Sequence, residues 1–271
     1  EPMPGLQPLA GEYKFHYYDQ RGCGKSTRPI DTFSSNDYSE NVSTLDGALG
    51  IGAQVADIER IRRILGEEKL ILIGHSWGGF LASLYAAEFP EHVEALILVA
   101  PADMLVVSRD RGGSLFEEVR TRLPDEMQEE YIAFLKEYLD YGSIFAKSEA
   151  DLVALNRKFG DYYLTAILGE EYAIEEEPSE QGDDGGWMVH AQYFSLGLMR
   201  HDYRDAMKVV QAPVLVMHGA DDLQPEEVTR VYVEAFPNAT LSVIADAEHS
   251  PFIDQPEAFA AAVGAFLSEL E

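Results

Sequence analysis

One serine stands in a setting that would make it a nucleophile. Ser76 lies in Gly74-His-Ser-Trp-Gly78, a G-x-S-x-G pattern between a short apolar run and a segment with helical spacing. A serine at a sharp strand-to-helix turn has a strained backbone and stands out at the end of the strand. The backbone N–H of Trp77 then faces the oxygen that becomes negative in a tetrahedral intermediate. These residues predict acyl transfer through Ser76.

A serine hydroxyl needs a base to take its proton, and that base needs an acid to orient it. With this pattern, the acid and then the histidine follow the serine along the chain. Among seven histidines, His249 is the one that follows the last apolar strand in a loop before a final helix. Asp221 and Asp222 follow the preceding strand, and either would supply the carboxylate. His75, next to the nucleophile, is expected to pack beneath it.

The elements that position these residues alternate between strand and helix. We predict strands at 14–18, 70–73, 95–99, 214–217 and 240–244. Helical spacing predicts helices near 51–65, 79–89 and 226–236 and from 256 onward. Short apolar strands that alternate with helices are typical of a parallel sheet covered on both faces.

A helical insertion interrupts this alternation. From about Asp103 to Met207 the segments have helical character and none is a convincing strand. We therefore predict an α/β fold with a mostly parallel, doubly wound sheet. Residues 1–102 and 208–271 form its core, and residues 103–207 form a helical cap over the sheet.

Composition limits the classes of function. The formal net charge of −28 argues against nucleic acid and anionic membrane as partners. No apolar run approaches the roughly 18 residues that a transmembrane helix needs, and Glu1–Ala10 lacks the features of a signal peptide. With a single cysteine, Cys23, the chain is expected to be cytoplasmic. No metal site or nucleotide-binding loop is evident, so we expect no cofactor and no metal.

The motifs resemble those of the α/β-hydrolase superfamily, and within it the proline iminopeptidase-like group. Four stretches carry this likeness: Tyr18–Ser26, Gly74–Gly79, His218–Asp222 and Glu248–Pro251. In the family's G-x-x-D pattern the acid is the third residue after the glycine, which implies Asp222 rather than Asp221. The resemblance implies the α/β-hydrolase fold and a catalytic triad of Ser76, Asp222 and His249.

The chain departs from the group's pattern at two places. Related proteins begin with further strands and an H-G-G-type loop that donates the second oxyanion N–H, and Glu1–Ala10 resembles the helix after that loop. We therefore expect further residues before Glu1. In the cap, the group's motif E-N-H-Y-F corresponds to His190-Ala-Gln-Tyr193-Phe194, which lacks the glutamate that binds the substrate's amine. The acidic run at 175–177 would replace that carboxylate, unless it is a solvated loop.

The resemblance implies a serine hydrolase that cleaves an amide or ester bond of a small molecule or short peptide. An aminopeptidase similar to proline iminopeptidase is the first interpretation, and a carboxylesterase or other small-ester hydrolase is the alternative. A non-catalytic binding protein with this fold is a rival of another class. We expect the cap residues to contact the substrate: Trp187, His190, Tyr193 and Phe194. The other interpretation is that the aromatic side chains among them only hold the cap helices together.

Overall fold

The computed structural model describes residues 3–106, 115–169, 185–197 and 201–270. They belong to two compact units. The first consists of residues 1–18, 55–109 and 200–271, and the second of residues 19–54 and 110–199. The acidic run at 175–177 lies outside the described residues.

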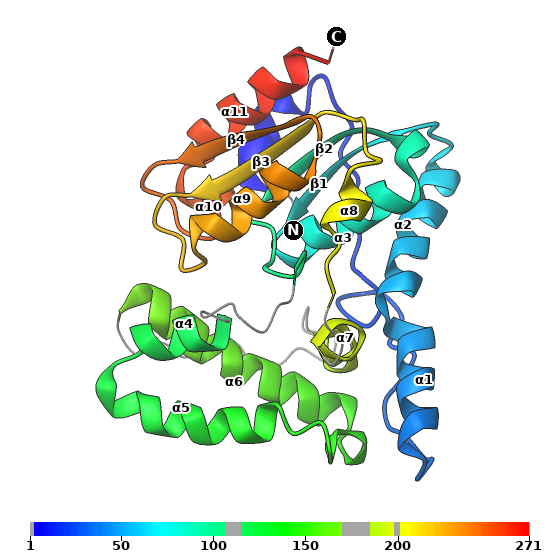
Figure 1. Ribbon diagram of the computed structural model, residues 1–271, viewed down its shortest axis with the longest axis vertical. Helices are drawn as coiled ribbons and strands as arrows, with labels where there is room; N and C mark the ends of the chain where they lie inside the picture. The colour runs from blue at the N-terminus through cyan, green and yellow to red at the C-terminus, as the bar shows by residue number, and fades with distance from the viewer. Residues whose placement is uncertain (1–2, 107–114, 170–184, 198–200, 271) are drawn as a thin grey trace. The chain divides into compact units, whose positions relative to one another are not determined.

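The first unit is built on a four-stranded parallel sheet (Figure 1). Its strands are β1 (Leu70–His75), β2 (Val93–Val99), β3 (Val214–Gly219) and β4 (Ala239–Ile244), and they lie side by side in this order. The strands predicted at 70–73, 95–99, 214–217 and 240–244 are thereby confirmed. Because all four run in the same direction, their carboxyl ends meet at one edge of the sheet, where ligand sites of α/β folds form.

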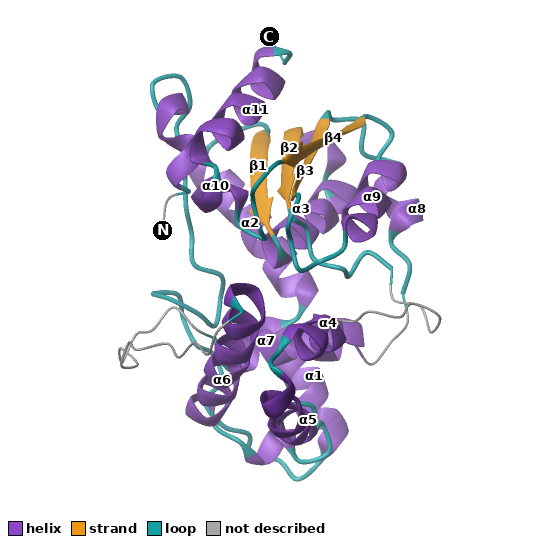
Figure 2. Cartoon of the chain, turned by 90° about the vertical axis from the view of Figure 1, so that its left-hand side faces the viewer, coloured by secondary structure: helices purple, strands orange, loops and turns teal. Residues whose placement is uncertain are grey.

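Helices cover both faces of this sheet. On one face lie α3 (Trp77–Glu88) and α9 (Glu226–Ala235), and on the other lie α11 (Pro256–Ser268) and a short 3₁₀ helix, η1 (Pro4–Leu9) (Figure 2). Alternate residues of β2 serve the two faces, as the period of a strand requires. Ile97 and Val99 pack with Phe259 of α11, and the whole strand core from Ala95 to Val99 is buried. The remaining helices of the unit are α2 (Ile51–Leu65, shared with the second unit), η2 (Pro90–His92), α8 (Arg204–Met207) and α10 (Pro251–Asp254).

The prediction of a strand at 14–18 is wrong, because these residues adopt no regular secondary structure. A β-rich composition forms a strand only where a neighbouring strand satisfies its N–H and C=O groups. In the described part of the chain, β1 pairs with β2 alone and forms an edge of the sheet. Phe15 packs against the core of the first unit, whereas Tyr17 and Tyr18 are exposed.

The second unit contains helices and no strand among its described residues. Its helices are α1 (Tyr38–Leu49), α4 (Leu115–Arg122), α5 (Asp125–Tyr138), η3 (Ile144–Ala146), α6 (Glu149–Leu168), α7 (Trp187–Gln192) and a short π-helix, η4 (Tyr193–Gly197). Leu45 and Leu49 of α1 share a buried cluster with Trp187 of α7. This packing groups residues 19–54 with the insertion, whereas the sequence pattern predicts that residues 1–102 belong to the core of the sheet domain.

A buried ion cluster joins α2 to α3. Glu59 is only 5% exposed, yet its carboxylate accepts bonds from Arg62 at 2.8 and 2.9 Å, from Arg63 at 2.6 Å and from Tyr85 of α3 at 3.0 Å. The Arg62 hydrogen bonds, with the others, hold the pKa of Glu59 well below its ordinary value of 4.5. Arg62 also donates to the carbonyl of Glu67, after the end of α2. The cluster fixes the helix that follows the nucleophile.

Removing this carboxylate is expected to destabilise the protein. Glu59→Gln leaves Arg62 without its charged partner in a buried setting, and we expect the Tm to fall by roughly 5 °C or more. The control is Glu94→Gln, which breaks the exposed Lys69–Glu94 pair and should change the Tm by less than about 2 °C. Since the pKa of Glu59 is lowered on folding, its stabilisation is present above pH 4.5 and is lost as the pH falls below that value. Equal Tm values for the two variants at pH 7 contradict the prediction.

Candidate active site

The backbone at Ser76 has the strained geometry that its motif predicts. Ser76 joins β1 to α3 with φ 52° and ψ −118°, a region that non-glycine residues rarely adopt. Its N–H donates to the carbonyl of Val99 at 2.9 Å, and its own carbonyl accepts from Gly79 and Ala102, each at 3.0 Å. Although Ser76 is at the N-cap position, its hydroxyl makes no capping bond to the helix. The fold thus fixes the backbone and leaves the Oγ available for chemistry.

The two glycines of the motif have different reasons to be there. A Cβ on Gly74 would lie 2.3 Å from the carbonyl oxygen of Gly78, so no side chain fits at this position. A Cβ on Gly78 meets nothing within 4 Å. The turn therefore requires Gly74 for steric reasons, and the packing of the described residues places no such demand on Gly78.

Asp222 and His249 meet at the carboxyl ends of the strands. The Nδ1 of His249 lies 2.9 and 3.1 Å from the two carboxylate oxygens of Asp222. The Asp222 side chain is fully buried, and that of His249 is 17% exposed. A buried carboxylate bonded to Nδ1 keeps the proton there and leaves Nε2 as the basic nitrogen.

Tight backbone contact brings these two loops together. A Cβ on Gly219, at the end of β3, would lie 1.9 Å from the carbonyl oxygen of Glu248. Asp221 donates its backbone N–H to the carbonyl of Ala247 at 2.9 Å, and the residue itself is exposed. Of the two candidate acids, it is Asp222 that the fold turns toward His249.

The surroundings of Asp222 direct its charge to His249. The Asp222 carboxylate also accepts the N–H of Gln224 at 2.8 Å. His218 lies 3.9 Å from it and shares a 3.0 Å hydrogen bond with Thr229. Burial lowers the pKa of His218, so this ring is neutral near pH 7 and does not compete with His249 as a cationic partner. Sequence patterns gave no signal for the Thr229 or Gln224 contacts.

Trp77 supplies the first backbone N–H group of α3. The N–H groups in the first turn of a helix have no intrahelical acceptor, and they favour negative charge. The backbone N–H of Trp77 is one of them and follows Ser76 directly. Its indole Nε1 is buried and has no hydrogen-bond partner among the described residues, while the ring packs on Phe80 at 5.4 Å.

The family described as the alpha/beta hydrolase fold matches residues 3–256. The chain belongs to this family. A proline iminopeptidase of Heyndrickxia coagulans is 26% identical over 274 residues, which cover 98% of this chain and 85% of that protein. The crystal structure of a proline iminopeptidase of Mycobacterium smegmatis has a TM-score of 0.59 at 21% identity and covers 94% of this chain and 79% of its own. For a thermophilic esterase of Thermogutta terrifontis the TM-score is 0.58 at 20% identity, with coverage of 98% and 84%. The family match and these relatives together identify the chain as a hydrolase.

In this α/β hydrolase the predicted substrate residues lie in the second unit. Trp187 is fully buried, stacks on Phe145 with centroids 5.8 Å apart and donates its Nε1–H to the carbonyl of Asp31 at 3.0 Å. Phe194 is 6% exposed and packs on Phe145 at 5.5 Å. Trp187 and Phe194 therefore pack within the second unit, and their contact with a substrate stays a prediction.

His190 and Tyr193 belong to a neighbouring aromatic group. The ring of His190 is fully buried, and its centroid lies 5.3 Å from that of Tyr138 and 5.9 Å from that of Tyr193. Neither of its nitrogens has a hydrogen-bond partner among the described residues. Burial lowers the pKa of His190 to about 4. At neutral pH the position that holds a glutamate in the group's motif thus holds an uncharged ring.

A nearly buried carboxylate, that of Glu149, lies close to these residues in the second unit, and it already has partners. Glu149 is 9% exposed and accepts the N–H groups of Gly186 at 2.8 Å and Trp187 at 2.7 Å. Arg28 lies 3.5 Å from the same carboxylate. Glu149 therefore caps the start of α7 and is neutralised by an arginine, so it does not replace the missing glutamate.

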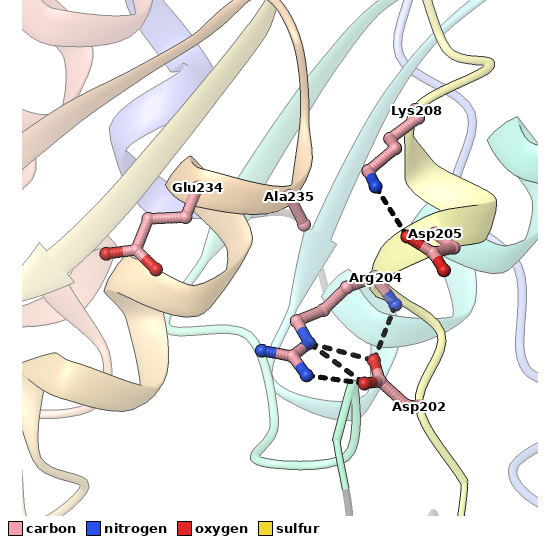
Figure 3. Close-up of a pocket in the computed structure, with 6 residues that line it drawn as sticks. All are labelled: Asp202, Arg204, Asp205, Lys208, Glu234 and Ala235. Atoms are coloured by element: carbon pink, nitrogen blue, oxygen red, sulfur yellow. Dashed lines mark hydrogen bonds and ion pairs between the residues drawn. The ribbon is translucent and has the colours of Figure 1, made fainter.

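A separate surface pocket beside α8 and α9 has a volume of about 300 Å³ (Figure 3). It is lined by Asp202, Arg204, Asp205, Lys208, Glu234 and Ala235. Arg204 is paired with Asp202 and Lys208 with Asp205, each at 2.5 Å, and no triad residue lines the pocket. Among the described residues, no cluster of His, Cys, Asp and Glu has the arrangement to hold a metal ion.

None of the described helices combines the length and apolarity needed to cross a membrane.

The two glycines of the nucleophile motif allow a paired test. Gly74→Ala forces a Cβ against fixed backbone and should lower the free energy of unfolding by roughly 2 to 3 kcal/mol or more. Gly78→Ala places its methyl group in open space within a helix, so the change should stay within about 1 kcal/mol of the parent chain. Urea unfolding of both variants measures the difference. Similar values for the two contradict the steric explanation of the turn.

Proposed function

We propose that this α/β hydrolase is a serine hydrolase with Ser76 as nucleophile, His249 as base and Asp222 as the residue that orients the base. The observation that carries the proposal is the bond of 2.9 Å between buried Asp222 and the Nδ1 of His249, on the sheet edge that also presents Ser76. Residues 103–207 are proposed as the cap of this enzyme.

The proposed reaction has two halves. In the first, the Ser76 Oγ bonds to the carbonyl carbon while Nε2 of His249 takes its proton, and His249 then gives that proton to the leaving amine or alcohol. In the second, His249 takes a proton from water, the hydroxide attacks the acyl-enzyme, and Ser76 regains its proton as the acid departs. Asp222 stabilises the imidazolium in both halves. The Trp77 N–H, at the start of α3, stabilises the oxyanion.

For the substrate we propose an amide with a small apolar N-terminal residue, as for an iminopeptidase. The support is the proline iminopeptidase relatives, of which the Heyndrickxia coagulans protein aligns over 98% of this chain. A small-ester hydrolase is the second candidate. It is favoured by a specific observation, the neutral His190 at the position of the amine-binding glutamate, together with the engagement of Glu149 elsewhere.

Substitution of the triad tests the mechanism. With an activated aryl ester, Ser76→Ala and His249→Ala should each lower kcat by roughly 10³- to 10⁶-fold, and Asp222→Asn by roughly 10⁴-fold because the wrong tautomer forms. The control is Asp221→Asn: this neighbouring residue is exposed, whereas the carboxylate bonded to Nδ1 of His249 is that of Asp222, so the substitution should leave kcat within about 2-fold. Wild-type turnover by Ser76→Ala refutes the proposal.

Amine recognition separates the two candidate substrates. An iminopeptidase should cleave prolyl arylamide at least about 100-fold faster than the N-acetylated compound, because a buried site for a charged amine rejects a ligand without it. A small-ester hydrolase should show no such preference and should favour aryl esters. Comparison of kcat/KM for the three compounds with one enzyme sample decides between them.

A further inference from the structure

His75 links the strand of the nucleophile to the loop of the base. It is the last residue of β1 and immediately precedes Ser76. Its Nε2 lies 2.8 Å from the backbone carbonyl oxygen of His249. Its ring also packs on the ring of His249, with centroids 4.9 Å apart, and edge-on against Phe252 of α10 at 5.0 Å.

The strand order of the sheet shows why this link between β1 and the loop after β4 matters. Ser76 follows β1 and His249 follows β4, and in the described sheet β1 and β4 are separated by β2 and β3. No backbone ladder therefore sets the distance between the nucleophile and the base. The loop after β4 has to reach back across the strand ends, and the contact with His75 is where it meets β1.

Other hydrogen bonds hold the same loop, but their partners do not lie on β1. The carbonyl of Asp246 accepts from Gln255 at 2.9 Å, and the N–H of Glu248 donates to Asp254 at 2.9 Å. Both partners lie in the α10–α11 region. The Asp222 carboxylate and the N–H of Asp221 fasten the loop to the end of β3.

We propose that His75 is a positioning residue for the reaction, whose Nε2–H donates to the carbonyl of His249 and so sets the base against Ser76. The inference rests on the proposed triad. Because a carbonyl oxygen only accepts, the proton of the neutral ring must be on Nε2. The groups that face His75 from neighbouring elements are His249 and, at longer range, Asp222.

The protonation state of His75 suits this role. Burial, followed by the proximity of His249, lowers the pKa of His75 to about 4. The ring of His75 is therefore neutral near pH 7. It adds no positive charge beside the His249 imidazolium that forms during the proposed reaction. A lysine or arginine would make the same bond but would oppose that charge.

The test uses two substitutions at this position with the full-length chain and an aryl ester. His75→Phe keeps an aromatic ring against Phe252 but removes the donor, and kcat should fall about 10- to 100-fold with KM changed less than about 3-fold. His75→Gln carries an amide N–H at a similar reach and should recover at least about 5-fold of the lost kcat. This rescue distinguishes the hydrogen bond from mere filling of space, even if His75→Phe is poorly folded.

The matched control is Gln255→Leu, which removes a hydrogen bond to the same loop without touching the triad. Its kcat should stay within about 2-fold of the parent value. The inference is overturned if His75→Phe keeps parent kcat, if His75→Gln is no better than His75→Phe, or if Gln255→Leu loses as much as His75→Phe. Failure of the proposed function is a different result: the parent chain then shows no turnover, or Ser76→Ala retains it.

Discussion

The site depends on the parallel alignment of four strands. Because β1, β3 and β4 all end at the same edge of the sheet, Ser76, Asp222 and His249 emerge on that edge although they are far apart in sequence. The register keeps the strand ends level, since Gly219 pairs with Ile244 and His75 with Val99. An antiparallel arrangement of any of these strands would send its last residue to the opposite edge.

Close backbone approach converts this alignment into a site. At Gly74, in the turn of the nucleophile, a Cβ would lie 2.3 Å from a carbonyl oxygen. At Gly219, against the loop of the base, it would lie 1.9 Å from one. Side chains are excluded at both places, so at each of them the glycine lies directly against backbone atoms: those of Gly78 at Gly74, and those of Ala247 and Glu248 at Gly219. Backbone contacts leave little freedom, and the residues of the proposed triad benefit from that rigidity.

The negative charge at the candidate site of the first unit is that of Asp222. Asp222 is buried and shares its oxygens between the ring of His249 and the N–H of Gln224. The two neighbouring histidines, His75 and His218, both have pKa values lowered by burial. Of these rings, it is His249 that is hydrogen-bonded to the buried carboxylate through its Nδ1.

The sequence by itself determined the parallel sheet, the order of its strands along the chain, and Ser76, His249 and one of the pair Asp221 and Asp222 as candidates; the choice of Asp222 came from the family resemblance. These features depend on local patterns: apolar runs of strand length, G-x-S-x-G, and polar residues directly after strands. Tertiary structure alone decided what depends on neighbours. Residues 14–18 form no strand because none of the described strands pairs with them, and Trp187 and Phe194 are buried among side chains of the second unit. The contact of His75 with His249 joins residues 174 positions apart across two intervening strands, a distance over which composition and periodicity carry no information.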